Sequence, residues 1–254
     1  MFYEVRNVGG AEYFRVDTEN NMNFPRHLHQ SFEIILVTGG KLTVDVDSGT
    51  YTLEEGDALM IFPHQIHSLS SEVSRHVTYI FSPLLVNSYF SALRGKVPAS
   101  GAFRMPEALA AALGSLSPDS SVIEKKGVLY SVCAAFDRGA RYVERKYKNG
   151  PFYDIFSFVE ENYTNECTLS DAVERVGMNY SYISRNFKKL VGMSFNDYVN
   201  LMRLNQACYL LRNSDISITD CGYESGFRSI HTFNRNFKEK YGISPQQYRK
   251  EQKN

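Results

Sequence analysis

The string Arg185-Asn186-Phe187-Lys188 returns 50 residues later as Arg235-Asn236-Phe237-Lys238, and this duplication decides the fold of the C-terminal part of the chain. Upstream of each copy lies a capping-box-like helix start, at Thr168–Asp171 and at Ser217–Asp220, where a hydroxyl and a carboxylate can satisfy free backbone N–H groups. Each start opens a short helix, which is followed by a glycine turn and by the helix with the repeated string. This order is a helix-turn-helix unit, so the sequence predicts two such units in a helical domain at residues 151–254.

The stretch between the two units predicts one long helix, because neither proline nor glycine interrupts Ser194–Arg212. The turn glycines, Gly177 and Gly226, lie 49 residues apart, so the second unit carries one extra residue in its turn. Two units held by one rigid helix can place two reading helices in successive major grooves of B-DNA, about 34 Å apart.

The second helix of each unit has an apolar face and a polar face at helical spacing. The predicted core residues are Ile183, Phe187, Leu190, Phe233, Phe237 and Tyr241. The predicted base-reading residues are Tyr180, Ser181, Ser184, Arg185, Ile230, His231, Asn234 and Arg235. The predicted phosphate contacts are Lys188, Lys189, Lys238 and Lys240. Arginine can bond guanine and asparagine can bond adenine in the major groove, whereas lysine at a phosphate strengthens binding without reading sequence. The alternative is a merely solvated face, with Arg185 and Arg235 bonded within their own domain.

Charge is distributed unevenly along the chain, although 28 basic and 28 acidic residues make its total zero. From Arg175 to the end there are 13 basic and 6 acidic residues, a balance of +7. The first 174 residues carry 15 basic and 22 acidic residues, a balance of −7, and five of the six histidines lie between His27 and His76. A basic end and a histidine-rich front predict two parts with different partners.

Several classes of protein are disfavoured by the sequence. No stretch approaches the roughly 18 apolar residues of a bilayer span, and Met1–Arg6 lacks the basic start and apolar run of a signal peptide, so we expect a cytoplasmic protein. The four cysteines lie far apart without a Cys-x-x-Cys pair, which favours buried thiols over disulfides or a zinc finger. We find no Ser/His/Asp or Cys/His spacing and no glycine-rich phosphate loop, so we expect no catalytic residues, no nucleotide site and no required cofactor.

The front of the chain, residues 1–82, reads as short strands in a sandwich or barrel. Leu42–Asp47 alternates apolar and polar residues with period two, as a half-buried strand does. Phe32–Val37 and Ala58–Phe62 are apolar runs of strand length, and we expect a turn at Thr38–Gly40, between the first of these runs and the alternating strand.

Four residues of this part form a candidate binding site. On an extended strand His27 and His29 point to the same face, so both rings can reach one ion or one ligand. With Glu33 and His67 they would give three histidines and one carboxylate, a set that suits Mn, Fe, Ni or Zn. The alternatives are histidines that bond a polar organic ligand in the barrel mouth, or that bond one another. His64 and His76 have no such spacing, and we expect them at the surface or rim.

We expect residues 83–150 to form a helical dimerisation or linker region. A short helix is expected at Glu107–Leu113. A longer helix is indicated by an apolar stripe at Leu129, Val132, Phe136, Ala140, Val143 and Tyr147. This stripe either packs on the chain's own barrel or forms a self-association seam. Lys148–Pro151 is a strong break and the expected domain boundary.

Residues 152–250 resemble the DNA-binding domain of the AraC/XylS family of bacterial transcription regulators. The matching residues include Gly177, Ile183, Arg185–Lys189, Gly192, Ser194, Tyr198, Ile218, Gly226, Phe227, Phe233, Arg235–Lys238, Gly242–Pro245, Tyr248 and Arg249. The front resembles the two cupin motifs, with His27, His29, Glu33 and His67 at the metal-ligand positions, and such a domain is the usual sensor of this family. Pro63–His67 departs from the second motif, because it lacks the usual glycine before the histidine.

The resemblance implies an α+β chain with two domains and a ligand-responsive regulator of transcription, such as an activator that works as a dimer. Its implied partners are promoter or operator half-sites in double-stranded DNA, a small-molecule effector such as a sugar or related metabolite, a second copy of the chain and RNA polymerase. Ala172-Val173 and Cys221-Gly222 depart from the family pattern, and Gly222 in place of alanine should loosen its helix by up to ~1 kcal/mol. The competing hypothesis is a metal-dependent cupin enzyme with a helical appendage. It rests on the histidine–carboxylate set alone, and the duplicated unit counts against it.

Overall fold

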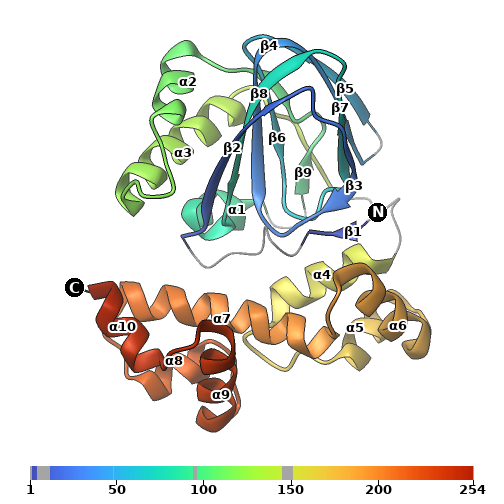
Figure 1. Cartoon of the computed structure of the whole chain (residues 1–254). Coiled ribbons are helices and arrows are strands. Elements are labelled where there is room, and N and C mark those ends of the chain that lie inside the picture. Colours follow the sequence, from blue (N-terminus) through green and yellow to red (C-terminus); the bar gives the residue numbers. More distant parts are fainter. Residues whose placement is uncertain (1, 5–11, 48, 94–95, 145–150, 254) are drawn as a thin grey trace. The chain divides into compact units, whose positions relative to one another are not determined.

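The computed structural model describes residues 2–4, 12–47, 49–93, 96–144 and 151–253, and the chain divides into two compact units, Met1–Lys148 and Asn149–Asn254. The first unit is rich in β-sheet and the second is helical, so the predicted α+β fold with two domains is confirmed (Figure 1). Among the described residues, no helix combines the length and the apolar character needed to cross a membrane.

Nine strands of the first unit form one continuous pairing network, and two more form a small separate sheet. The nine strands are β1 (Phe2–Tyr3), β2 (Phe14–Asn20), β3 (Phe24–Leu28), β4 (Phe32–Val46), β5 (Gly49–Glu54), β6 (Asp57–Ile61), β7 (His67–Ser70), β8 (Ser74–Phe81) and β10 (Ala102–Arg104). The small sheet pairs β9 (Lys96–Pro98) with β11 (Tyr142–Glu144). The order of the large network runs from β1 to β10 without returning to its start, so the strands make an open sandwich.

Strand β4 belongs to both layers of the sandwich. Its first half pairs with β6 and β8, and its second half pairs with β5 and β7. The turn expected at Thr38–Gly40 is wrong, because the 15-residue strand continues through it. A register shift between Val37 and Gly39 bends the strand there, and Gly40 takes a φ of 72°, which glycine adopts without strain.

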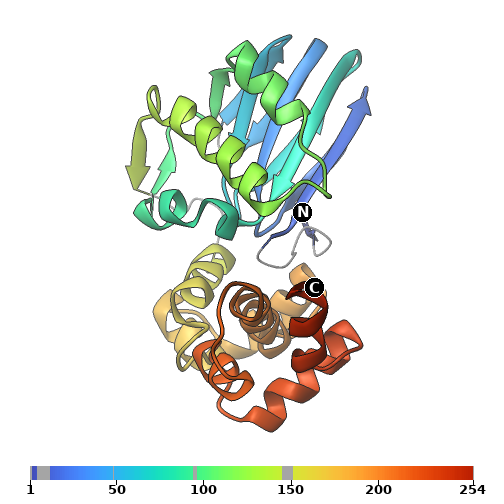
Figure 2. The same cartoon turned by 90° about the vertical axis from the view of Figure 1, so that its left-hand side faces the viewer.

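The two faces of the sheet around β4 pack into different cores. Ile35, Val37 and Leu42 point between the layers and are fully or almost fully buried, together with Leu59 and Ile61 of β6. The opposite face of β4, β6 and β8 is covered by helices α2 (Glu107–Gly114) and α3 (Val122–Asp137), which lie across the sheet (Figure 2). The short helices η2 (Pro83–Val86) and α1 (Asn87–Ala92) precede them.

The middle of the chain therefore packs within the first unit. The stripe residues Leu129, Val132 and Phe136 are buried in the core between α3 and the sheet, so this part of the stripe faces the chain's own sandwich. The predicted continuation of the helix through Ala140 and Val143 is wrong. The helix ends at Asp137, near Gly139, and Tyr142–Glu144 pairs with β9 instead. Tyr147 and most of the expected boundary at Lys148–Pro151 lie outside the described residues.

The second unit contains seven helices in the described part of the chain. They are α4 (Pro151–Asn162), α5 (Leu169–Val176), α6 (Tyr180–Val191), α7 (Phe195–Asn213), α8 (Ile218–Glu224), α9 (Ile230–Tyr241) and α10 (Pro245–Lys253). The predicted starts are confirmed, since the hydroxyl oxygens of Thr168 and Ser217 accept hydrogen bonds from the backbone N–H groups of Asp171 and Asp220. The turn glycines Gly177 and Gly226 both have positive φ, which glycine adopts without strain.

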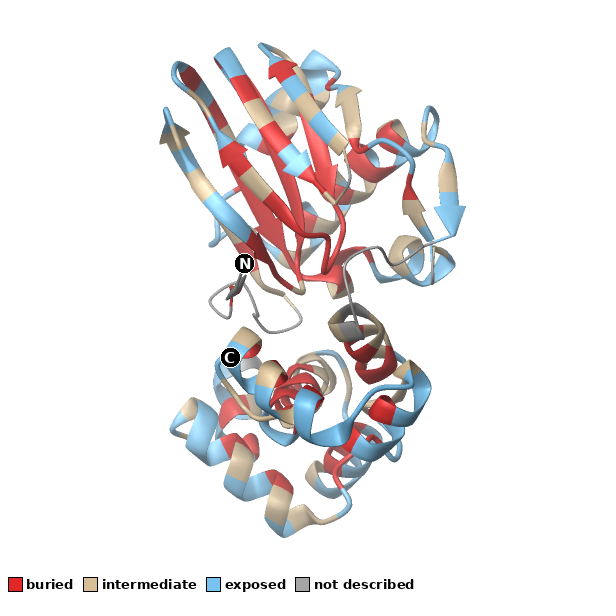
Figure 3. Cartoon of the chain, turned by 90° about the vertical axis from the view of Figure 1, so that its right-hand side faces the viewer, coloured by how far each residue is buried: buried red, intermediate tan, exposed pale blue. Residues whose placement is uncertain are grey.

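Each helix-turn-helix half has its own aromatic core. Phe187 of α6 packs edge-on against Tyr198 of α7 and near Phe156 of α4, and Phe237 of α9 packs edge-on against Phe233 and Tyr248. The predicted core residues Ile183, Phe187, Phe233 and Phe237 are fully buried, whereas Leu190 and Tyr241 are half-buried. Burial colouring marks these cores as narrow buried stripes inside helices that are otherwise exposed (Figure 3).

All four cysteines, Cys133, Cys167, Cys208 and Cys221, are buried free thiols, as the sequence predicted. Burial raises the pKa of the Cys133 thiol to about 12 and the pKa values of Cys167 and Cys221 to about 11. Gly222, next to Cys221, lies against the Phe233 ring, where a Cβ atom would come within 3.0 Å of Cδ1. Glycine therefore allows α8 and α9 to approach closely.

Candidate nucleic-acid interface and sensor cluster

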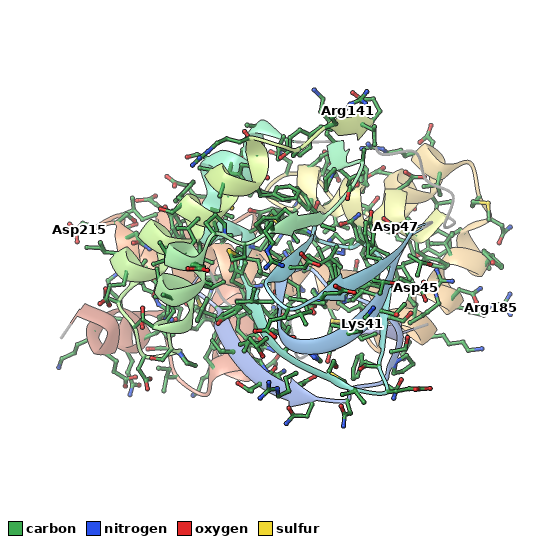
Figure 4. All side chains as sticks on the ribbon, turned by 90° about the horizontal axis from the view of Figure 1, so that it is seen from above. Lys41, Asp45, Asp47, Arg141, Arg185 and Asp215 are labelled. Carbon is green, nitrogen blue, oxygen red and sulfur yellow. The ribbon has the colours of Figure 1, made fainter. Side chains whose placement is uncertain are left out.

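The repeated string places equivalent side chains on the exposed faces of α6 and α9. Arg185 and Arg235 are both exposed, as are Lys188 and Lys238 one turn further along. Arg185 extends away from the ribbon in Figure 4. Its Nε donates a hydrogen bond to the carbonyl oxygen of Ser181 on the same helix, at 3.2 Å.

The remaining predicted DNA-contacting residues are mostly accessible. Tyr180, Ser181, His231, Asn234, Lys189 and Lys240 are exposed, and Ser184 is half-buried. The prediction that Ile230 lies on the polar face is wrong. Ile230 is half-buried and packs against the core of the second half. Its place at the first residue of α9 directs it to the apolar side, where Phe233 and Phe237 follow at helical spacing.

The structure brings His27, His29, Glu33 and His67 together from three strands and a turn. One donor atom from each lies within 4.8 Å of the others, and all four residues are buried. Nε2 of His29 lies 2.8 Å, and Nε2 of His67 3.2 Å, from Oε2 of Glu33. Cross-strand pairing of His27 with His67 holds their rings 4.0 Å apart between centroids.

Backbone carbonyls fix how the three histidine rings are oriented. Nδ1 of His27, His29 and His67 lies 3.0, 3.1 and 2.9 Å from the carbonyl oxygens of Pro25, Ser31 and Gln65. A carbonyl only accepts hydrogen bonds, so each Nδ1 donates and the three Nε2 atoms are the ring atoms that face the cluster. A ring that also donates from Nε2 to Glu33 carries both protons, whereas a neutral ring presents the lone pair of Nε2 to the cluster. This is the orientation in which imidazole binds a metal ion or accepts a hydrogen bond from a ligand.

Electrostatics favour a charged carboxylate at the centre of the cluster. Burial alone would raise the pKa of Glu33, but His67 and the hydrogen bonds from His29 and His67 outweigh it and hold the pKa well below its usual range. Burial lowers the pKa of His27 to about 3, helped by the neighbouring His67. His27 is therefore neutral near pH 7, as a metal ligand or a hydrogen-bond acceptor must be.

A cavity of about 30 Å³ lies beside the cluster. Four carboxylates line it, those of Glu4, Asp17, Glu19 and Glu33, and none of its described lining residues is lysine or arginine. Glu4 reaches the cluster, with Oε2 3.6 Å from Nε2 of His27. The volume is enough for about two water molecules.

Sequence reasoning missed the acidic residues of this interior. Asp17 and Glu19 alternate with Val16 and Thr18 along β2, a period-two signal that indicates one inward face. The surface or rim positions expected for His64 and His76 are wrong, because both residues are fully buried. His76 faces Glu19 across the β2–β8 pairing, with Nε2 3.6 Å from Oε2, and the backbone N–H of His64 donates to the carbonyl of His29.

Comparison with known proteins supports this division into two parts. Residues 172–251 match a family described as a helix-turn-helix domain, and residues 9–118 match an AraC-like ligand binding domain. The chain is 35% identical over 105 residues to the melibiose operon regulatory protein of Escherichia coli (strain K12), a match that covers 41% of this chain and 35% of that protein. The chain thus spans about a third of that relative's length.

Two further relatives extend the comparison. The transcriptional activator AarP of Providencia stuartii is 31% identical over 96 residues, which cover 38% of this chain and 71% of AarP. The transcriptional activator RhaS of Yersinia pestis (strain Pestoides F) is 23% identical over 249 residues, which cover 89% of each protein. Similarity to transcriptional regulators therefore extends over most of this chain.

Proposed function

Because the chain belongs to the AraC family of regulators, we propose that it binds promoter DNA sequence-specifically and changes that binding when a small molecule enters its first unit. The observation that carries the proposal is the pair of equivalent exposed faces on α6 and α9, each with an arginine followed one turn later by a lysine. The arginines would read base edges and the lysines would hold phosphates. Such a regulator works in the cytoplasm on double-stranded DNA, and RNA polymerase and a second copy of the chain are its further partners.

The interior of the first unit supports a neutral or cationic effector. Its carboxylates would repel an anion, whereas hydroxyl groups can donate hydrogen bonds to Asp17, Glu19 and Glu33. A sugar or related metabolite fits this chemistry, and one similar protein is named for the melibiose operon. The cavity is small, so such an effector has to displace water and shift Met22 and Phe24, which also line it. An effector changes DNA affinity only if it binds the two arrangements of the protein differently.

The histidine cluster also suits a divalent metal ion. His27, His29, Glu33 and His67 would hold it, since carbonyl-bonded Nδ1 atoms leave the three Nε2 atoms directed at the carboxylate. A bound metal would supply an attachment point for an effector oxygen. In the metal-free protein the same residues can bond a polar ligand directly.

Binding of the purified full chain to DNA upstream of its own and neighbouring genes tests the proposal. We expect at least one duplex to bind with an affinity 10³-fold or more above that of a scrambled duplex, as specific regulators do. We also expect candidate sugars to change that affinity. A chain that binds every duplex equally would contradict the regulatory function.

The three histidines and one carboxylate also favour a second candidate, a metal-dependent cupin enzyme. Metal analysis of the purified chain with turnover assays separates the two. One tightly held metal per chain together with turnover would favour the enzyme, and specific DNA binding without turnover would favour the regulator.

A further inference from the structure

The two helix-turn-helix halves of the second unit touch each other directly, although α7 already joins them. The contact lies between the loop at residues 163–166, which follows α4, and the turn at residues 226–228, between α8 and α9. Gly226 is buried there with a φ of 94°, and a Cβ atom on it would lie 2.5 Å from the carbonyl oxygen of Tyr163 and 2.7 Å from Cα of Thr164. The two backbones are therefore packed against each other at a distance that only glycine allows.

Arg203 lies near the middle of α7 and fastens the loop to that helix. Its Nε donates to the carbonyl oxygen of Tyr163 at 2.6 Å, and its Nη2 donates to the carbonyl oxygen of Asn165 at 3.0 Å. Nε of Arg203 is also the next neighbour that a Cβ atom on Gly226 would meet, at 3.0 Å. One guanidinium thus contacts both halves, and its planar fork satisfies two backbone carbonyls at once.

Two further contacts continue the same seam. The guanidinium carbon of Arg203 lies 6.0 Å from the ring centroid of Phe227, a residue buried in the core of the second half. Arg228 forms an exposed ion pair with Glu166, with Nη2 2.7 Å from Oε1. An exposed pair contributes little by itself, so the buried backbone contact and the Arg203 fork carry most of the seam.

We propose that Arg203 is a positioning residue that fixes the spacing and angle between the reading helices α6 and α9. The inference rests on the proposed DNA-binding function. Helix α7 packs into the cores of both halves, through Tyr198 in the first and Leu204 and Cys208 in the second, so it sets their distance and restrains their rotation. Short segments outside helices lie at both of its ends, at residues 192–194 and 214–217. The seam removes the remaining freedom of rotation. The protein should therefore accept its two DNA elements at one separation only, near the 10–10.5 base pairs of one helical turn.

Selection of binding sites from a randomised DNA duplex library tests the inference with the full chain. We expect the wild-type chain to select two short elements at a single separation, and Arg203→Ala to select the same elements at separations that differ by several base pairs. In direct binding, inserting one base pair between the elements should weaken the wild type at least tenfold and Arg203→Ala less than threefold.

A matched control is Arg212→Ala. Arg212 also lies on α7, but its guanidinium bonds the Tyr248 hydroxyl and lies 5.4 Å from the Tyr248 ring centroid, within the second half. Its loss should leave the separation of the elements unchanged. Arg203→Lys keeps the charge but cannot hold both carbonyls in a planar fork. It should widen the selected separations less than alanine does, and it provides the test if the alanine variant proves unfolded by circular dichroism.

The possible outcomes distinguish a failure of the positioning role of Arg203 from a failure of the proposed DNA-binding function. If the wild type selects paired elements and both folded Arg203 variants keep the wild-type separation, Arg203 does not position the helices, although the regulatory function stands. If the wild type selects no sequence at all, the DNA-binding function fails and the positioning role fails with it.

Discussion

At the scale of single residues, recognition of the DNA sequence should depend on the side chains of Arg185 and Arg235. Both are exposed and occupy equivalent positions on the two reading helices. Replacing either by alanine should weaken specific DNA binding by ~1–3 kcal/mol, about 5- to 150-fold, because an arginine–guanine pair is lost without any change in the core.

Titration of a selected operator duplex by electrophoretic mobility shift measures this effect. Arg175→Ala is the matched control, since Arg175 is also exposed in the second unit but lies on α5, where it pairs with Glu161. Equal affinities for the wild type and both reading-helix variants would mean that neither arginine reads a base.

A second residue-scale prediction concerns His29 in the sensor cluster. His29→Ala removes a buried ring whose Nε2 lies 2.8 Å from Glu33, so it should abolish the change in DNA affinity caused by the effector. Binding without effector should stay within about twofold, because α6 and α9 belong to the other compact unit.

Fluorescence anisotropy of labelled duplex, with and without the sugar that acts on the wild type, tests the His29 variant. Lys41→Ala serves as control, since Lys41 is exposed on β4, the strand that carries Glu33, and pairs with Glu54 at the surface. A full effector response in His29→Ala would place the effector site elsewhere.

The position of a side chain could be predicted where residue spacing fixes which face of a strand it lies on. It could not be predicted where burial depends on strands that are far away in the sequence. The period of an extended strand predicted that His27 and His29 face the same way, and the structure places both beside Glu33 and His67. His76 is buried only because β8 pairs with both β2 and β4, a pairing that no local pattern encodes. The roles of the cluster and of the exposed polar faces in binding remain predictions.

At the scale of elements, the close packing of α8 against α9 depends on the absence of a side chain at Gly222. Alanine at position 222 would gain ~1 kcal/mol of helix propensity, but its Cβ would crowd the fully buried Phe233 ring at 3.0 Å. Overpacking of this kind costs about 1–3 kcal/mol. We therefore expect Gly222→Ala to destabilise the second unit by about 1 kcal/mol.

Gly127→Ala is the matched comparison for Gly222→Ala, because Gly127 lies in α3 and a Cβ atom there would meet nothing within 4 Å. It should stabilise the first unit by roughly 0.5–1 kcal/mol. Scanning calorimetry of both variants gives the signs, and a higher unfolding temperature for Gly222→Ala would show that the Phe233 ring yields easily.

A further element-scale prediction concerns the apolar stripe of α3. Leu129 is fully buried against the sheet, so Leu129→Ala should lower the unfolding free energy of the first unit by about 2–5 kcal/mol. Ile123 on the same helix is 84% exposed, and Ile123→Ala should change it by less than about 0.5 kcal/mol. Urea titration followed by circular dichroism measures both, and equal effects would contradict the packing of the stripe on its own sheet.

Element boundaries were predictable where a cap or a turn residue acts locally. The starts of α5 and α8 follow from Thr168 and Ser217, whose hydroxyls cap them. A pair of glycines does not by itself distinguish a turn from a bend in a strand. Gly39 and Gly40 suggested a turn, but they lie where one continuous strand bends. The end of α3 at Asp137 depends on the pairing of β11 with β9, which the stripe of apolar residues could not reveal.

At the scale of the whole molecule, the uneven charge predicts strong salt dependence. If Lys188, Lys189, Lys238 and Lys240 each neutralise one phosphate, log K should fall with log salt at a slope of about −3.6. Raising salt from 50 to 200 mM should then weaken binding about 150-fold. Lys238→Gln should reduce the slope by about one unit at every sequence. Anisotropy titrations at four salt concentrations test this, and a slope near zero would exclude these phosphate contacts.

The burial of all four native thiols has a practical consequence for such work. A cysteine introduced at the surface would be the fastest to react with maleimide reagents, because the thiolate form of the native side chains is suppressed. Lys189→Cys and Glu239→Cys, at matching exposed positions of α6 and α9, would accept a pair of spin labels without first removing any native cysteine. The distance distribution between those labels would report directly how rigidly the chain spaces its two reading helices.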